Sequence, residues 1–230
     1  MAADQHRRIV VAIDGPAGAG KSTIAKRLAA RLGFTYIDTG AMYRAVALWA
    51  RREGLDWADA HRMEALARAA GIELQPGRIW LNGNEITDTI RTPEISDGAS
   101  KVSAIPGVRR AMVEQQRAIG ERISVVMEGR DIGTVVFPNA DVKIFLDANP
   151  GERVRRRLAE VRAKGDTITE DELARQMRER DERDSTRGDS PLAQAPDAVY
   201  FDSSGLNLDQ VEEGILRIIR DRISNGKEYR

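Results

Sequence analysis

The sequence predicts an α/β fold in which helices flank a parallel sheet. Short apolar runs alternate with segments whose apolar residues recur at helical spacing, which is typical of repeated βα units. The strand candidates are apolar throughout, as expected of strands that are covered on both faces. A glycine-rich turn joins the first apolar run to the first helix, which is a third feature of this class.

Five apolar runs are the strand candidates, and we expect strands at Ile9–Ile13, Phe34–Ile37, Ser124–Met127, Val142–Leu146 and Ala198–Phe201. Helical spacing predicts helices at Lys21–Leu32, Ala41–Arg52, Pro150–Lys164, Glu170–Asp184 and Leu208–Ile223. Gly33 is a stop signal for the first helix. Thr169 and Glu172 form a capping-box pattern at the start of the fourth, and Asn207 can cap the last.

The stretch from about Trp57 to Gly120 breaks this alternation. Helices are expected there at Ala58–Ala70, Pro93–Val102 and Val108–Ile119. Between them, residues 72–87 alternate in polarity around Asn82-Gly83, which is a strong hairpin signal. A small antiparallel sheet within a parallel α/β chain predicts an inserted subdomain. We therefore divide the chain into a core of residues 1–56 and 121–230 and an insert of residues 57–120.

Composition excludes several classes of site. The 230 residues contain no cysteine, which rules out disulfides, thiolate metal sites and a cysteine nucleophile. Lys+Arg and Asp+Glu are 36 each, so no bulk field attracts nucleic acid or an anionic membrane. No apolar run approaches the roughly 20 residues that span a bilayer. The polar residues 1–8 and the short run after them do not resemble a secretion signal. We expect a cytoplasmic monomer with no nucleic-acid, membrane or obligate protein partner.

The strongest motif lies between the first strand and the first helix. Residues 15–22 are GPAGAGKS and fit the P-loop pattern G-x-x-x-x-G-K-[ST] at every required position. Glycines let the backbone N–H groups point at phosphate oxygens, and the helix N-terminus adds its positive dipole end. Lys21 supplies a charge to the β- and γ-phosphates, and the Ser22 hydroxyl is placed for Mg²⁺. The nucleotide-binding residues are thus predicted to be Gly15, Pro16, Ala17, Gly18, Ala19, Gly20, Lys21, Ser22 and Thr23.

Arginines at strand ends favour a small-molecule kinase among the P-loop classes. A GTPase would need an Asn-Lys-x-Asp segment, which the sequence lacks, and the nearest candidate for an ATPase carboxylate is Glu128. Arg44 follows the second strand, and Arg130 follows the third. Strand ends in such sheets open onto the ligand crevice. Four more charged residues share one helix face: Arg180, Arg183, Asp184 and Arg187. They could bind phosphate, or they could form ordinary ion pairs on a solvated helix surface.

Three segments beyond the P-loop resemble those of bacterial cytidylate kinases, in the nucleoside monophosphate kinase family. Residues 38–44 are DTGAMYR, residues 129–138 are GRDIGTVVFP and residues 180–187 are RDERDSTR. The resemblance runs from about Ile9 to Ile219. It implies a P-loop NTPase-type core with five parallel strands, a CMP-binding insert and a short lid at about residues 153–168. It also implies ATP-dependent phosphorylation of CMP and dCMP, with Mg²⁺ as the cofactor.

The resemblance also implies roles for individual residues. The catalytic groups would be Lys21, Arg130, Arg180 and Arg187. The substrate-binding residues would be Thr39, Tyr43, Arg44, Ser100, Arg109, Arg130, Asp131, Arg180, Asp184 and Arg187. Asp131 can accept from the cytosine N4 amino group, and Arg109 can donate to N3 or O2. Because uracil has a carbonyl at that position, Asp131 would face it unpaired, and such a mismatch discriminates strongly.

Two other functions remain open at this stage. One is a P-loop kinase for another acceptor, such as UMP, AMP or a small metabolite. A shikimate-type kinase shows D-x-D near the second strand, where this chain has Asp38-Thr39-Gly40. The other is a nucleotide-sensing module without turnover. The sequence does not decide whether Glu128 orients Arg130 or Mg²⁺-bound water, nor which arginine of residues 153–157 contacts ATP.

Overall fold

The computed structural model describes residues 8–163, 165 and 167–225. Five strands form one parallel sheet in the order β2-β6-β1-β7-β8, which confirms the predicted fold class. The strands are β1 Val10–Asp14, β2 Thr35–Asp38, β6 Val125–Gly129, β7 Val142–Asp147 and β8 Val199–Asp202. Residues 164 and 166 of the predicted lid, and residues 1–7 on which the absence of a secretion signal was predicted, lie outside the described residues.

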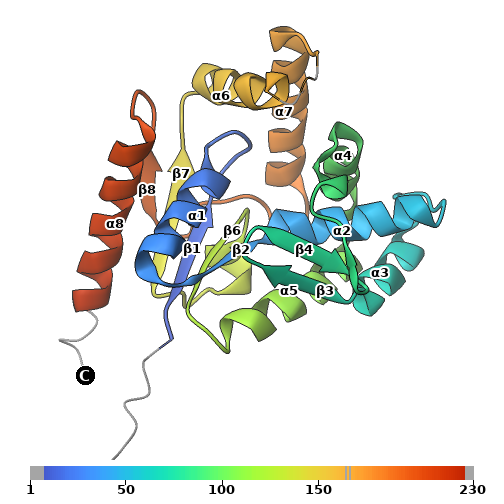
Figure 1. The fold of residues 1–230 in the computed structure, drawn as a ribbon, viewed down its shortest axis with the longest axis horizontal. Helices are drawn as coiled ribbons and strands as arrows, with labels where there is room; N and C mark the ends of the chain where they lie inside the picture. The colour runs from blue at the N-terminus through green and yellow to red at the C-terminus, as the bar shows by residue number, and fades with distance from the viewer. Residues whose placement is uncertain (1–7, 164, 166, 226–230) are drawn as a thin grey trace, which may run out of the picture.

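Helices cover both faces of this sheet (Figure 1). On one face, apolar residues of α1 (Lys21–Leu32) and α8 (Leu208–Asn225) pack against alternate residues of β1, β6 and β7. The other face packs against α5 (Pro106–Gly120) and a π-helical turn, Ile132–Val136. β1 is buried at every position, as the continuous apolar pattern predicts. β8 lies at the sheet edge, and its Tyr200 is 52% exposed, so the expectation of two covered faces is wrong for this strand.

A second apolar core is formed by elements that lie beside the parallel sheet, and Figure 1 shows the arrangement of these elements. It joins α2 (Thr39–Arg52), α3 (Ala60–Ala69), α4 (Pro93–Val102) and part of α5 to a three-stranded antiparallel sheet. That sheet contains β3 Ile72–Gln75, β4 Arg78–Leu81 and β5 Asn84–Glu85, and the 3₁₀ turn Thr89–Arg91 follows it. Asn82 and Gly83 both have positive φ, 51° and 77°, which is the backbone of the predicted hairpin turn.

Two helices stand at the end of the sheet where the strands finish (Figure 1). α6 (Pro150–Arg162) and α7 (Glu170–Thr186) share a small apolar cluster of Val154, Leu158, Leu173 and Met177. The Thr169 hydroxyl accepts from the Glu172 N–H at 3.3 Å, which confirms the predicted cap of α7. Within the described residues, none of the helices combines the length and the apolar character needed to cross a membrane.

Candidate active site

The P-loop follows β1 at the carboxyl end of the parallel sheet, the edge at which such sheets bind ligands. The backbone approaches β7 so closely at Gly15 that a Cβ there would lie 2.0 Å from the Leu146 carbonyl oxygen. Gly18 and Gly20 have φ of 74° and 88°, which L side chains rarely adopt. The glycines of the motif therefore meet a steric requirement of this turn.

Lys21 is the first residue of α1, and its side chain is buried beneath the P-loop. The Nζ donates to the Pro16 carbonyl at 2.7 Å. Burial, together with the charges of Arg130 and Arg180, lowers the pKa of Lys21 from 10.5 to about 7. A buried cation among other cations is stabilised by an anion, so the site favours a phosphate next to Lys21.

Side-chain oxygen atoms of the kind that bind metal ions lie beside Lys21, at the end of β6. Glu128 is 4% exposed, and its carboxylate accepts from the Tyr36 hydroxyl. Burial and the nearby Asp38 raise the pKa of Glu128, while a hydrogen bond from Ser22 lowers it. A hydroxyl and a carboxylate are the ligand types that Mg²⁺ takes at phosphate sites, where phosphates and water complete its shell. The chemistry of Ser22 and Glu128, which share a hydrogen bond, thus fits the expected Mg²⁺.

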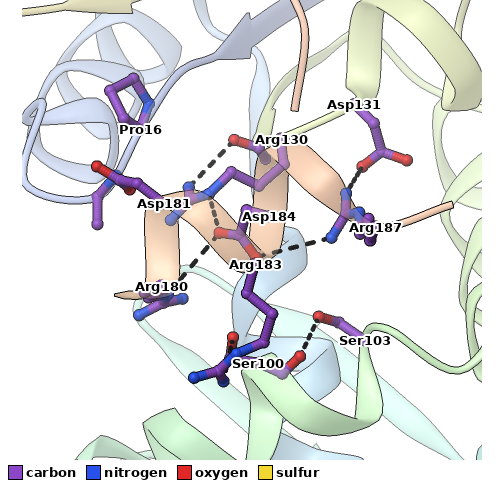
Figure 2. Close-up of polar contacts among 12 residues, drawn as sticks. Pro16, Ser100, Ser103, Arg130, Asp131, Arg180, Asp181, Arg183, Asp184 and Arg187 are labelled. Atoms are coloured by element: carbon purple, nitrogen blue, oxygen red, sulfur yellow. Dashed lines mark hydrogen bonds and ion pairs between the residues drawn. The ribbon is translucent and has the colours of Figure 1, made fainter. Parts of the chain in front are cut away.

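A group of charged side chains between β6 and α7 forms what we call the phosphate clamp: Arg130, Arg180, Asp184 and Arg187. Asp184 is buried at its centre, 2.9 Å from Arg130, 3.8 Å from Arg187 and 3.9 Å from Arg180 (Figure 2). Although burial raises the pKa of Asp184, Arg130 and Arg180 bring it below its ordinary value. The alternative of a solvated helix face is therefore wrong for Asp184.

The clamp holds more positive than negative groups. Burial and the neighbouring Arg130 lower the pKa of Arg180 to about 10. Among the described residues, four guanidinium nitrogens near this site are buried without a hydrogen-bond partner: Nε of Arg44, Nε of Arg109, Nε of Arg180 and Nη2 of Arg187. Buried donors of this kind are costly unless they are satisfied. The arrangement fits an anion that accepts several hydrogen bonds at once.

Asp131 and Arg109 form a buried ion pair at the side of the clamp that faces the second core. Arg109 also donates to the Ser103 carbonyl at 3.1 Å, and its guanidinium lies 5.6 Å from the centre of the Tyr43 ring. Arg187 lies 3.7 Å from Asp131, so the pair is continuous with the clamp. A fixed carboxylate next to a fixed guanidinium offers one acceptor and several donors to a planar ligand edge.

Arg44, Thr39 and Ser100 were also predicted to bind the substrate, and the side chain of each has a polar partner in the structure. Arg44 lies 2.9 Å from Asp38, the residue that caps α2. The Thr39 hydroxyl is buried and donates to the Glu128 carbonyl at 2.7 Å, so in this structure it supports β6. Ser100 on α4 accepts from Arg183 on α7 at 2.9 Å, which joins the two helices (Figure 2).

A groove of about 780 Å³ lies on the other side of the P-loop. It runs between α1, α6 and the loop before α8, and Gly18, Thr23 and Arg156 are among its lining residues. Arg156 is held by the Ser203 carbonyl at 2.8 Å. Of the arginines in residues 153–157, Arg156 is therefore the one that lines this groove, whereas Arg155 is exposed.

Asp14 is a site residue that the sequence analysis did not single out. It ends β1, and its carboxylate accepts from the N–H groups of Ile132 and Gly133 at 2.8 and 2.7 Å. These bonds hold the turn that carries Asp131. Burial raises the pKa of Asp14 from 3.8 to about 6, although the two N–H groups lower it. The sequence feature that could have indicated Asp14 is its position as an acidic residue directly after an apolar run.

Known proteins share this architecture and sequence. The family model described as "Cytidylate kinase" matches residues 11–221. The chain is 69% identical to a cytidylate kinase from Solibacter usitatus over all of both chains. It is 47% identical to a bifunctional pantoate ligase/cytidylate kinase from a Synechococcus strain, of which it spans 41%. A gluconokinase structure from Sinorhizobium meliloti covers 97% of this chain and 100% of its own, with a TM-score of 0.50 and 15% identity, a likeness of fold alone.

Proposed function

The chain belongs to the cytidylate kinase family, and we propose that it transfers the γ-phosphoryl group of ATP to CMP and dCMP. The products are ADP and CDP or dCDP. The single observation that carries the proposal is the set of partly buried arginines around the buried Asp184, which is joined to the Asp131–Arg109 pair. One ligand with a phosphate and a hydrogen-bonding base edge satisfies both groups.

The donor lies on the P-loop, with its base and ribose in the groove beside Arg156. Backbone N–H groups of the loop and the start of α1 hold the phosphates, and Lys21 neutralises charge on the transferred group. Ser22 and Glu128 are the residues that would hold Mg²⁺, which supplies further charge neutralisation to the phosphates when it is bound.

The acceptor phosphate lies in the clamp, with Arg44 at its other side. A CMP phosphate oxygen attacks the γ-phosphorus in line, and the bond to the ADP oxygen breaks. That phosphate is largely ionised at neutral pH, because its second pKa is about 6, so no side chain has to remove a proton. The clamp arginines balance the charge that spreads over the transferred group.

Asp131 and Arg109 select the base. Asp131 accepts from the cytosine N4 amino group, and Arg109 donates to N3 or O2. We propose that residues 57–120 supply the rest of this pocket through Ser100 on α4 and the packing of α5, which carries Arg109. Closure of the residues near 153–168 over the donor would exclude water, since water would otherwise compete as acceptor.

Release of ADP from ATP·Mg²⁺ tests this function, with CMP, dCMP, UMP, AMP and GMP offered in parallel and a control without acceptor. Fast turnover with CMP and dCMP alone is the expected result. Lys21→Met should lower kcat about 100- to 1000-fold. Equal use of UMP would contradict the base recognition, and no turnover with any monophosphate would contradict the function. ATP and CMP are intracellular metabolites, and we propose that the enzyme acts in the cytoplasm.

A further inference from the structure

One residue of the P-loop is held at both of its peptide groups by an ion pair from the two helices that follow β7. The Ala17 N–H donates to Asp181 Oδ1 at 3.0 Å, and the Ala17 carbonyl accepts from Arg153 Nη1 at 2.9 Å. The same Nη1 lies 2.5 Å from Asp181 Oδ2. We call Arg153 and Asp181 the P-loop clasp. Arg153 comes from α6 and Asp181 from α7, so the clasp joins three segments of the chain.

Apolar packing fixes the same contact. Ala17 packs against the cluster between α6 and α7 to which Met177 belongs. At Gly18, a Cβ would lie 2.7 Å from Met177 Cε and 2.8 Å from the Arg153 carbonyl oxygen. The loop and the two helices therefore touch without room for a side chain. The clasp pair is itself half-buried, at 13% and 19% side-chain exposure, so solvent screens it less than a surface pair.

The position of Asp181 on α7 connects this contact to the acceptor side. Asp184, at the centre of the phosphate clamp, comes three residues later, on the neighbouring part of the same helix face. Figure 2 shows Asp181 on the side of Pro16 and Asp184 among Arg130, Arg180 and Arg187. The same helix, α7, thus carries Asp181, which contacts the P-loop, and Asp184, which lies within the phosphate clamp.

We propose that Asp181, paired with Arg153, is a positioning residue that sets α7 against the P-loop, so that the phosphate clamp is aligned with the donor phosphates. The proposal rests on the proposed function. It assigns to the clasp no contact with either substrate. Misplacement of reacting groups by about 1 Å can cost roughly 100-fold in rate. Loss of the clasp should therefore lower kcat far more than it lowers the affinity for ATP or CMP alone.

The test compares Asp181→Ala and Arg153→Met with Glu182→Ala, a matched control that removes an exposed carboxylate from the next position of α7. We expect kcat with CMP to fall about 100-fold in both clasp variants. The dissociation constants for ATP alone and for CMP alone, from titration calorimetry, should change less than about threefold. The double variant should be no slower than either single one, since the pair acts as a unit. Glu182→Ala should match the wild type.

Hydrogen exchange gives a second readout that needs no acceptor. In the nucleotide-free protein, the Ala17 amide should exchange faster in Asp181→Ala than in the wild type and in Glu182→Ala, because Asp181 accepts from it. If the wild type fails to phosphorylate CMP, the proposed function fails, and the exchange result still decides whether the clasp orders the loop. Unchanged exchange, or a kcat close to wild type, would overturn the proposal. So would tighter ATP binding and faster turnover in Asp181→Ala, because the carboxylate would then compete with the nucleotide phosphates.

Discussion

Lys21 should take up a proton when ATP binds. Burial and the charges of Arg130 and Arg180 lower its pKa to about 7, whereas Glu128 and Asp14 act in the opposite direction. A lysine is charged below its pKa, so at pH 8 most of the free enzyme carries Lys21 neutral. Phosphates on the P-loop favour the charged form, and binding therefore returns the pKa toward its ordinary value.

The size of this effect follows from the pKa. With a pKa of about 7, Lys21 is roughly half charged at pH 7 and about one-tenth charged at pH 8. Binding should thus take up about 0.5 proton per ATP at pH 7 and about 0.9 at pH 8. If only the charged form binds, the dissociation constant rises about fivefold between these two pH values.

Titration calorimetry at pH 8, in two buffers of different ionisation enthalpy, measures this uptake. The terminal phosphate of ATP is already ionised at that pH, since its second pKa is about 6, so it adds little to the signal. Lys21→Arg keeps its charge at every accessible pH and should show no uptake. No uptake by the wild type at pH 8 would refute the reasoning. Equal uptake by wild type and Lys21→Arg would also refute it, because the proton would then belong to Asp14 or Glu128.

Two further predictions concern the base pocket and the P-loop backbone. Asp131→Asn removes the charge that pairs with Arg109. In steady-state kinetics, we expect kcat/KM for CMP to fall about 100-fold while kcat/KM for UMP changes little. If the ratio of these two values stayed as in the wild type, the role of Asp131 in base recognition would be contradicted. Gly15→Ala places a Cβ 2.0 Å from the Leu146 carbonyl and should lower the free energy of unfolding in urea by about 3 kcal/mol or more. Gly33→Ala also has positive φ, but no atom lies near its Cβ, so about 1 kcal/mol is expected; equal losses would argue against the steric account.

Most elements of the fold were predictable because local patterns determine them. β1 and α1 lie within a residue of their predicted bounds, since an apolar run and an amphipathic helix flank a recognisable turn. The helix after the second strand was expected to begin at Ala41, yet the Asp38 carboxylate caps α2, and the helix begins at Thr39. Gly77, with φ of 78°, divides the predicted hairpin into a three-stranded sheet.

The edge position of β8 and the π-helical turn after β6 were not predictable in this way. An apolar run such as residues 199–201 does not show whether a neighbouring strand lies on both sides. The turn at Ile132–Val136 has no periodic signal, and the buried carboxylate of Asp14, 118 residues earlier in the chain, accepts from its Ile132 N–H. Such features depend on contacts between distant segments.

In the candidate site, too, local sequence determines some features and contacts between distant segments determine others. Local motifs identified the charged residues of the clamp, and the structure brings Arg130 to Asp184 across 54 positions of sequence. The pairing of Asp181 with Ala17, across 164 positions, had no local signal, although Asp181 lies within the charged segment of residues 180–187. Residue types and their spacing can therefore identify candidate functional groups, whereas the contacts between these groups depend on the tertiary fold.

The ratio of kcat/KM for CMP to that for UMP in the wild-type enzyme tests base recognition by Asp131 and Arg109 most directly. We expect a ratio of about 100 or more, because the Asp131 carboxylate accepts from the cytosine amino group and meets only a carbonyl on uracil. A ratio near one would show that the buried Asp131–Arg109 pair does not select the base, and it would contradict the proposed specificity for CMP.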